Sequence, residues 1–168
     1  MLGPTRPIQV RCAGLDEDAC MRRTASCRSP DTLATSPPNH ETRPALVHCP
    51  AGQDVIVGSG ASDVLVPADV GVAWLDLRGV AGGVRATLPP DVSHVSARLY
   101  RESGLSERGE LVQKWNSMTG DLAVERLGDG QWTLVVEGIA DRKAVEFKQR
   151  FSVQGQPVDL GLLQRRTR

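Results

Sequence analysis

The sequence predicts an all-β fold, an antiparallel β-sandwich behind an irregular, cysteine-bearing N-terminal extension. Between residues 54 and 163, about eight or nine short apolar runs alternate with turn signals, a spacing that is typical of sandwiches. No helical pattern separates these runs, so a parallel βαβ sheet is not expected. The first 50 residues differ in composition, because they contain all four cysteines, seven of the eleven prolines and only two of the seventeen glycines.

This shift in composition divides the chain into three parts. We expect an extension over residues 1–50, a sandwich domain over residues 51–163 and a basic, solvated tail over residues 164–168. Within the extension, Asp16-Glu17-Asp18 precedes Arg22-Arg23, an order of charges that complements a helix dipole and predicts a short helix. The proline-rich residues that follow predict irregular chain.

The expected strands follow in order along the second part. Residues 54–57 and 63–66 are joined by glycines and serines, which predicts a hairpin. Further strands are expected at residues 70–78, 84–88, 94–101, 110–115, 145–153 and 158–163. Trp74 and Trp132 each lie within an apolar run, so both are expected in the core.

The central expected feature is a hairpin over Leu122–Gly138. Two alternating runs flank Gly128-Asp129-Gly130, and Asp-Gly between such runs is a strong hairpin signal because glycine adopts a positive φ without steric cost. In the second run, Trp132, Leu134 and Val136 share one face by the two-residue period of a strand. The other strands must cover that apolar face.

Two segments of the second half resemble a known family. Residues 130–137, Gly-Gln-Trp-Thr-Leu-Val-Val-Glu, resemble the Gly-x-aromatic-Thr-Leu-x-Val strand of carboxypeptidase-regulatory-like (transthyretin-like) β-sandwich domains, and another Ig-like sandwich is the alternative. Residues 157–161, Pro-Val-Asp-Leu-Gly, are similar to the closing strand of these domains, and the similarity covers about residues 70–163. The Gly-x-Val-x-Asp strand that opens such domains is absent. The resemblance implies a non-catalytic accessory or surface module.

The four cysteines are Cys12, Cys20, Cys27 and Cys49. We favour two disulfides, because an even number of cysteines in a segment with few apolar residues is typical of a disulfide framework in an oxidising compartment. All three connectivities stay open. Free buried thiols are the second interpretation, and a mixed zinc site with His40 or His48 is the third, although no C-x2-C pair is present. We therefore predict no metal site and no cofactor.

Charge and hydropathy limit the expected partners and location. Lys+Arg and Asp+Glu both number 20, so the formal net charge is zero and no nucleic-acid partner is expected. No stretch is as long as a membrane span, and residues 1–18 lack the apolar segment of a signal peptide. As written, the chain would stay in the cytoplasm. If the start is misassigned or the chain is a fragment, we expect an extracellular or cell-envelope location.

One surface patch is the candidate binding site. We expect strand 94–101 to pair antiparallel with strand 110–115, with Arg101 opposite Glu110. That register places four candidate binding residues on one face: Arg98, Tyr100, Gln113 and Trp115. An aromatic ring with polar neighbours there would stack on a sugar ring or anchor a protein partner. A register shifted by one residue would instead turn Trp115 into the core.

No catalytic motif emerges from the sequence. Ser59 lies in Val-Gly-Ser-Gly-Ala, which is not a Gly-x-Ser-x-Gly elbow, and His94 opens a strand. The preferred function is therefore a non-catalytic binding or structural module, an accessory or surface-interaction domain with a protein or glycan partner. The alternatives are a carbohydrate-binding module that uses Tyr100 and Trp115, and a hydrolase with an unrecognised site.

Overall fold

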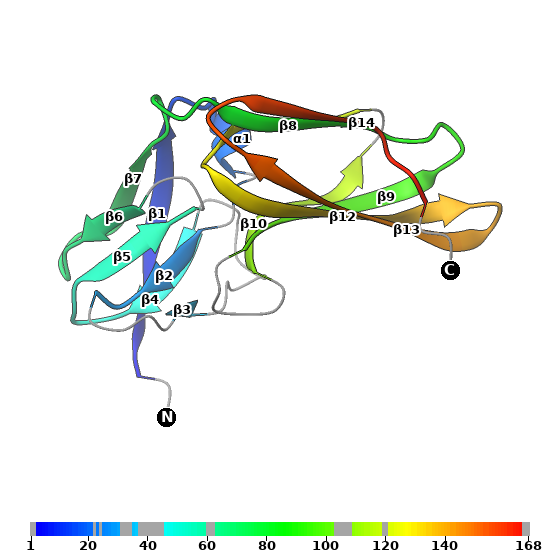
Figure 1. The fold of residues 1–168 in the computed structure, drawn as a ribbon. Helices are drawn as coiled ribbons and strands as arrows, with labels where there is room; N and C mark the ends of the chain where they lie inside the picture. Colours follow the sequence, from blue (N-terminus) through cyan, green and yellow to red (C-terminus); the bar gives the residue numbers. More distant parts are fainter. Residues whose placement is uncertain are drawn as a thin grey trace. The chain divides into compact units, whose positions relative to one another are not determined.

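The computed structural model is an all-β protein whose chain forms two compact units (Figure 1). It describes residues 3–21, 23, 25–30, 35–36, 46–59, 63–102, 109–118 and 121–165. Unit 1 is Met1–Gly79 and unit 2 is Val80–Arg168. The predicted all-β fold class is confirmed, because sheets account for most of the described residues in both units.

The described residues of unit 1 form a short helix and two sheets. One sheet has the strand order β4-β1-β7, and the other has the order β3-β2-β5-β6. The elements are β1 Thr5–Ala13, α1 Glu17–Met21, β2 Ser26–Arg28, β3 Thr35–Ser36, β4 Leu46–Pro50, β5 Val55–Gly58, β6 Asp63–Val66 and β7 Val72–Asp76. Buried side chains from both sheets form one core cluster, so the sheets pack as a sandwich.

The first 50 residues contain regular structure where the composition predicted an irregular extension. β1 pairs antiparallel with β4 and also pairs in parallel with β7. β2 pairs with β5, which begins beyond the expected boundary. The expected boundary near residue 50 therefore lies inside unit 1, because strands on its two sides complete each other's sheets. The expected short helix is present as α1, where the Asp16 carboxylate accepts a hydrogen bond from the Ala19 N–H at 2.7 Å.

Two disulfides connect the elements of unit 1. Cys12 in β1 is bonded to Cys20 in α1, and Cys27 in β2 is bonded to Cys49 in β4. The second bond joins the two sheets through the core, where Cys27 is 1% and Cys49 0% exposed. The favoured disulfide interpretation is confirmed, and none of the four sulfurs remains as a thiol for zinc. His40 lies outside the described residues.

The described residues of unit 2 form a second sandwich. Its sheets have the orders β10-β9-β12-β13 and β11-β8-β14, and side chains from both build one core cluster around Trp132 and Phe147. The strands are β8 Gly82–Thr87, β9 Ser93–Arg101, β10 Glu110–Met118, β11 Leu122–Leu127, β12 Gly130–Ala140, β13 Lys143–Val153 and β14 Pro157–Leu162. Trp132 is 0% exposed, as predicted. In the expected tail, Arg165 is exposed and forms an ion pair with Asp91, and residues 166–168 lie outside the described residues.

The predicted hairpin over Leu122–Gly138 is wrong. β11 pairs with β8 in one sheet, whereas β12 pairs with β9 and β13 in the other. Gly128 and Asp129 therefore cross from one sheet to the other. Local bonds hold this crossing: Trp132 Nε1 donates to the Gly128 carbonyl at 3.0 Å, and the Asp129 carboxylate accepts from the Gly155 N–H at 2.7 Å.

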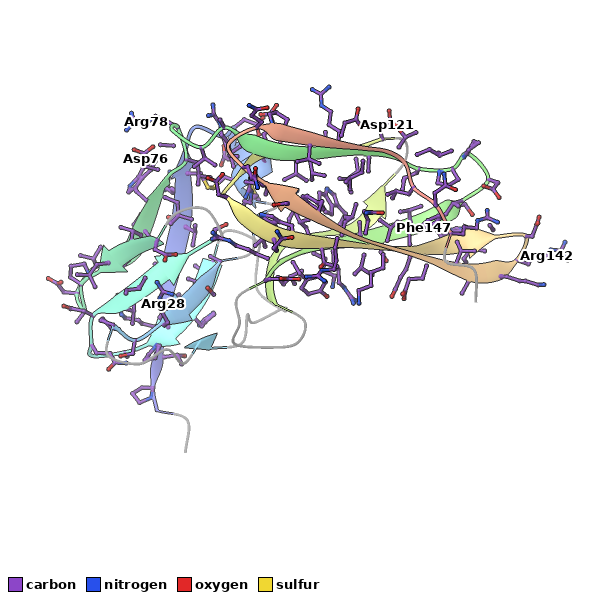
Figure 2. All side chains as sticks on the ribbon, in the orientation of Figure 1. Arg28, Asp76, Arg78, Asp121, Arg142 and Phe147 are labelled. Atoms are coloured by element: carbon purple, nitrogen blue, oxygen red, sulfur yellow. A yellow bond between two sulfur atoms is a disulfide. The ribbon has the colours of Figure 1, made fainter. Side chains whose placement is uncertain are left out.

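The long hairpin of unit 2 is β12–β13 instead. Its turn residues Asp141 and Arg142 have φ of 51° and 61°, the positive values that a two-residue turn between twisted strands requires. Figure 2 shows Arg142 at the tip of this hairpin. No glycine marks this turn in the sequence, because aspartate and arginine occupy the left-handed positions.

Candidate functional site

The strands that carry the predicted patch contain a bulge. β9 and β10 pair antiparallel with Glu110 opposite Arg101, as expected. The register then shifts by one residue between Leu111 and Gln113. A bulge of this kind turns the side chains that follow it to the opposite face of the strand.

The bulge divides the four predicted binding residues between the two faces of the sheet. Arg98 is exposed and Tyr100 is half-buried on the outer face. Gln113 lies opposite the buried Leu99 and is itself only 6% exposed, and Trp115 packs against the core of unit 2. The predicted single face is therefore not formed, and the binding roles of Arg98 and Tyr100 stay predictions.

Unit 1 exposes a tryptophan that the sequence pattern assigned to the core. Trp74 on β7 is 59% exposed, whereas its neighbours Ala73 and Leu75 are 1% and 0% exposed. The prediction for Trp74 is wrong because apolar residues occupy both faces of this strand, so the pattern does not reveal which face is outward. Only the position of the neighbouring strands decides the orientation.

Polar side chains of β1 lie beside the exposed indole. Arg11 is directly opposite Trp74 in the parallel pair β1–β7, and its guanidinium carbon lies over the ring at 5.8 Å from the centroid. This is within the range of a cation–π contact. Arg11 Nη2 also donates to Gln9 Oε1 at 3.4 Å. We call the outward residues Gln9, Arg11, Val72, Trp74 and Asp76 the Trp74 face.

Asp76 supplies a fixed negative charge at the end of this face. Arg78 donates to both of its carboxylate oxygens at 2.9 Å, from Nε and Nη2 (Figure 2). The Arg78 backbone N–H adds a third bond at 3.1 Å. The hydrogen bonds from the Arg78 side chain make the largest contribution and the bond from its backbone N–H the next. Together they lower the pKa of Asp76 to about 2. The carboxylate is therefore charged throughout the neutral and mildly acidic range.

We expect the Asp76 carboxyl group to titrate near pH 2 in the folded protein, and Arg78→Gln to raise that midpoint towards the ordinary value of 3.8. The folded pKa is lower than the unfolded one, so the pair stabilises the fold above about pH 3.8 and this contribution is lost as the pH falls towards 2. NMR titration of the carboxyl carbon measures the midpoint. An identical midpoint in Arg78→Gln would contradict the assignment.

A groove of about 570 Å³ lies over β8 in unit 2. Its charged lining residues are Arg85, Glu125, Arg126 and Asp159, and its floor includes Gly83. Arg126 Nη1 donates to the Val80 carbonyl at 3.0 Å, and the Asp159 carboxylate accepts from the Gly161 N–H at 2.8 Å. The lining contains no serine, cysteine or histidine, so its only ionisable side chains are these two carboxylates and two guanidinium groups.

The described residues considered for catalysis differ in their exposure to solvent. Ser59 is 0% exposed, so a substrate cannot reach its hydroxyl. His94 is exposed on β9, and His48 is half-buried on β4 in the other unit. In the part of the chain that the structure describes, no group of three or more His, Cys, Asp or Glu residues is arranged to hold a metal ion.

Comparison with known proteins adds no assignment. No protein-family model matches the chain, and a search of curated proteins finds no match. Among the described residues, no helix has the length and apolar character needed to cross a membrane.

Proposed function

We propose that the chain is a non-catalytic binding module that contacts its ligand through the Trp74 face. The observation that carries this proposal is the 59% exposure of Trp74 beside Arg11, on a sheet whose other side is buried. Tryptophan and arginine are enriched among the residues that dominate binding energy, because a flat ring and a planar cation offer a large contact area with little conformational freedom to lose.

The disulfides of unit 1 support this role. Cys27–Cys49 joins the sheet that carries Trp74 to the other sheet, so the face is supported by a covalently tied sandwich. A rigid platform loses less entropy when a ligand binds. Disulfides persist in oxidising compartments, which fits the accessory or surface module that the family resemblance implies. We therefore place the proposed function outside the reducing cytoplasm.

We propose carbohydrate as the ligand class for the Trp74 face. The apolar face of a sugar ring packs on an exposed indole, and the groups around Trp74 offer both donors and acceptors to sugar hydroxyls. The donors are the Gln9 amide and the Arg11 guanidinium, and the Asp76 carboxylate is an acceptor. The ligand class is the same as in the carbohydrate-binding alternative that the sequence suggested. The proposed aromatic contact is now Trp74 in place of Tyr100 and Trp115.

Native gel electrophoresis with embedded neutral polysaccharides (xylan, galactomannan and β-glucan) tests this function. We expect at least one of them to retard the wild-type chain, and Trp74→Ala to abolish that retardation. Leu65→Ala is the matched control, because Leu65 is an apolar residue of unit 1 with 56% exposure and lies in the other sheet. Equal retardation of Trp74→Ala and the wild-type chain would contradict the proposal, and so would the absence of retardation by all three polysaccharides.

A further inference from the structure

The outer face of the four-stranded sheet in unit 2 carries a line of cationic side chains. Val135 on β12 pairs with Arg98 on β9 and with Lys148 on β13, and Arg98 pairs with Lys114 on β10. All three cations are exposed. Neighbouring strands lie about 4.8 Å apart, so the line spans about 14 Å across the sheet. We call Lys114, Arg98 and Lys148 the cationic row.

The bulge in β10 creates this row. Without it, Gln113 would lie opposite Arg98, as the sequence register predicted, and the row would have two cations. With it, Lys114 takes that position. Like charges directly opposite each other in a sheet are destabilising. Among the described residues, none of the three cations forms an ion pair that would offset this repulsion. The charges are therefore available to an anionic ligand.

The neighbouring rows limit the shape of that ligand. On one side lie Tyr100 and Thr133, followed by Arg150, whose guanidinium is held by Glu102 at 2.5 Å. On the other side, Glu137 and Glu146 lie opposite each other. An acidic row beside a cationic one repels a broad polyanion such as duplex DNA and accepts a thin chain that follows the cations across the strands.

We propose that the cationic row binds a polysaccharide chain with a carboxylate on each sugar. Repeated carboxylates along a thin chain complement cations on three of the four strands, with Val135 between Arg98 and Lys148, and charge-assisted hydrogen bonds of this type are the stronger ones. The Tyr100 ring and the Thr133 hydroxyl flank the row and are suited to sugar rings and hydroxyl groups. This site is separate from the Trp74 face and does not depend on it.

Isothermal titration with oligogalacturonate tests the proposal on the full chain. We expect Arg98→Gln/Lys148→Gln to weaken binding about tenfold or more, with a shallower dependence on salt because two contacts to the anion are lost. The matched control is Arg142→Gln/Lys143→Gln at the tip of the β12–β13 hairpin, which removes the same charge from the same unit and is expected to leave the affinity within about twofold. Trp74→Ala should bind like the wild-type chain.

Four results would overturn the proposal. Equal weakening by both double variants would show that only the overall charge matters. Equal affinity for the methyl-esterified, uncharged oligomer would show that the carboxylates are not recognised. Tighter binding of dextran sulfate or duplex DNA than of oligogalacturonate would assign the row to another polyanion. Loss of binding in Trp74→Ala alone would place the anion on the Trp74 face and overturn the assignment to unit 2. The proposed function fails by a different result, which is equal retardation of Trp74→Ala and the wild-type chain by neutral polysaccharide.

Discussion

Replacing Cys27 and Cys49 by alanine is expected to lower the free energy of unfolding of unit 1 by about 3 kcal/mol. The bond closes a segment with a sequence separation of 22 residues, and opening it returns chain entropy to the unfolded state. For a unit of this size, the loss corresponds to a decrease in melting temperature of roughly 10–20 °C. Hydrogen exchange resolved by peptide measures the effect, with protection expected to fall in β5 and β7.

The second disulfide provides the matched control for this prediction. Cys12–Cys20 has a sequence separation of only 8 residues, so Cys12→Ala/Cys20→Ala is expected to cost less, about 2 kcal/mol. Protection in β12 should stay unchanged in both variants, because the two units have separate core clusters. Wild-type stability in Cys27→Ala/Cys49→Ala would contradict the role given to the bond between the sheets.

Trp132→Ala is expected to destabilise unit 2 by about 3–5 kcal/mol, the range for removing a large aromatic side chain from a packed core. Trp132 is 0% exposed, donates to the Gly128 carbonyl and lies beneath Arg101, whose guanidinium carbon is 5.9 Å from the ring centroid. The variant therefore loses core packing. It also loses the hydrogen bond to Gly128, in the segment where the chain passes from one sheet to the other. Urea denaturation followed by circular dichroism measures the change.

Trp132→Phe separates the two contributions. Phenylalanine keeps an aromatic ring in the core but loses three ring atoms and the hydrogen bond, so a smaller loss, about 1–2 kcal/mol, is expected. A loss in Trp132→Phe as large as that in Trp132→Ala would mean that the hydrogen bond to Gly128, and not packing, holds the crossing.

The sequence predicts the strands of unit 2 well because each has one apolar and one polar face. His94–Arg101, for example, becomes β9 with Val95, Ala97 and Leu99 buried, as the alternation requires. β1 was not predicted because its outward residues include Pro7, a residue type that is depleted in strands, and because its partners β4 and β7 are distant in sequence. Local pattern carries no information about such long-range pairing.

The candidate sites depended on features that local pattern does not encode. Asp-Gly at residues 129–130 is a valid turn signal, but the turn connects two sheets and not two paired strands. The bulge at Val112 decides whether Gln113 or Lys114 lies beside Arg98, and one extra residue leaves no recognisable mark in the sequence. Arg98 and Tyr100 lie on the outer face, as the alternation of residues predicted, whereas the outward positions of Trp74 and Lys114 required the strand register.

The indole N–H signals of the three tryptophans provide the most direct test of the proposed binding face. They are assigned by single Trp→Phe variants and followed by NMR during a titration. The added ligand is an oligosaccharide of the neutral polysaccharide that retards the chain in the native gel. We expect the Trp74 signal to move with saturation, while the signal of the buried Trp132 stays in place. Movement of the Trp115 signal with a stationary Trp74 signal would disprove binding through the Trp74 face and return the binding site to the patch that the sequence alone predicted.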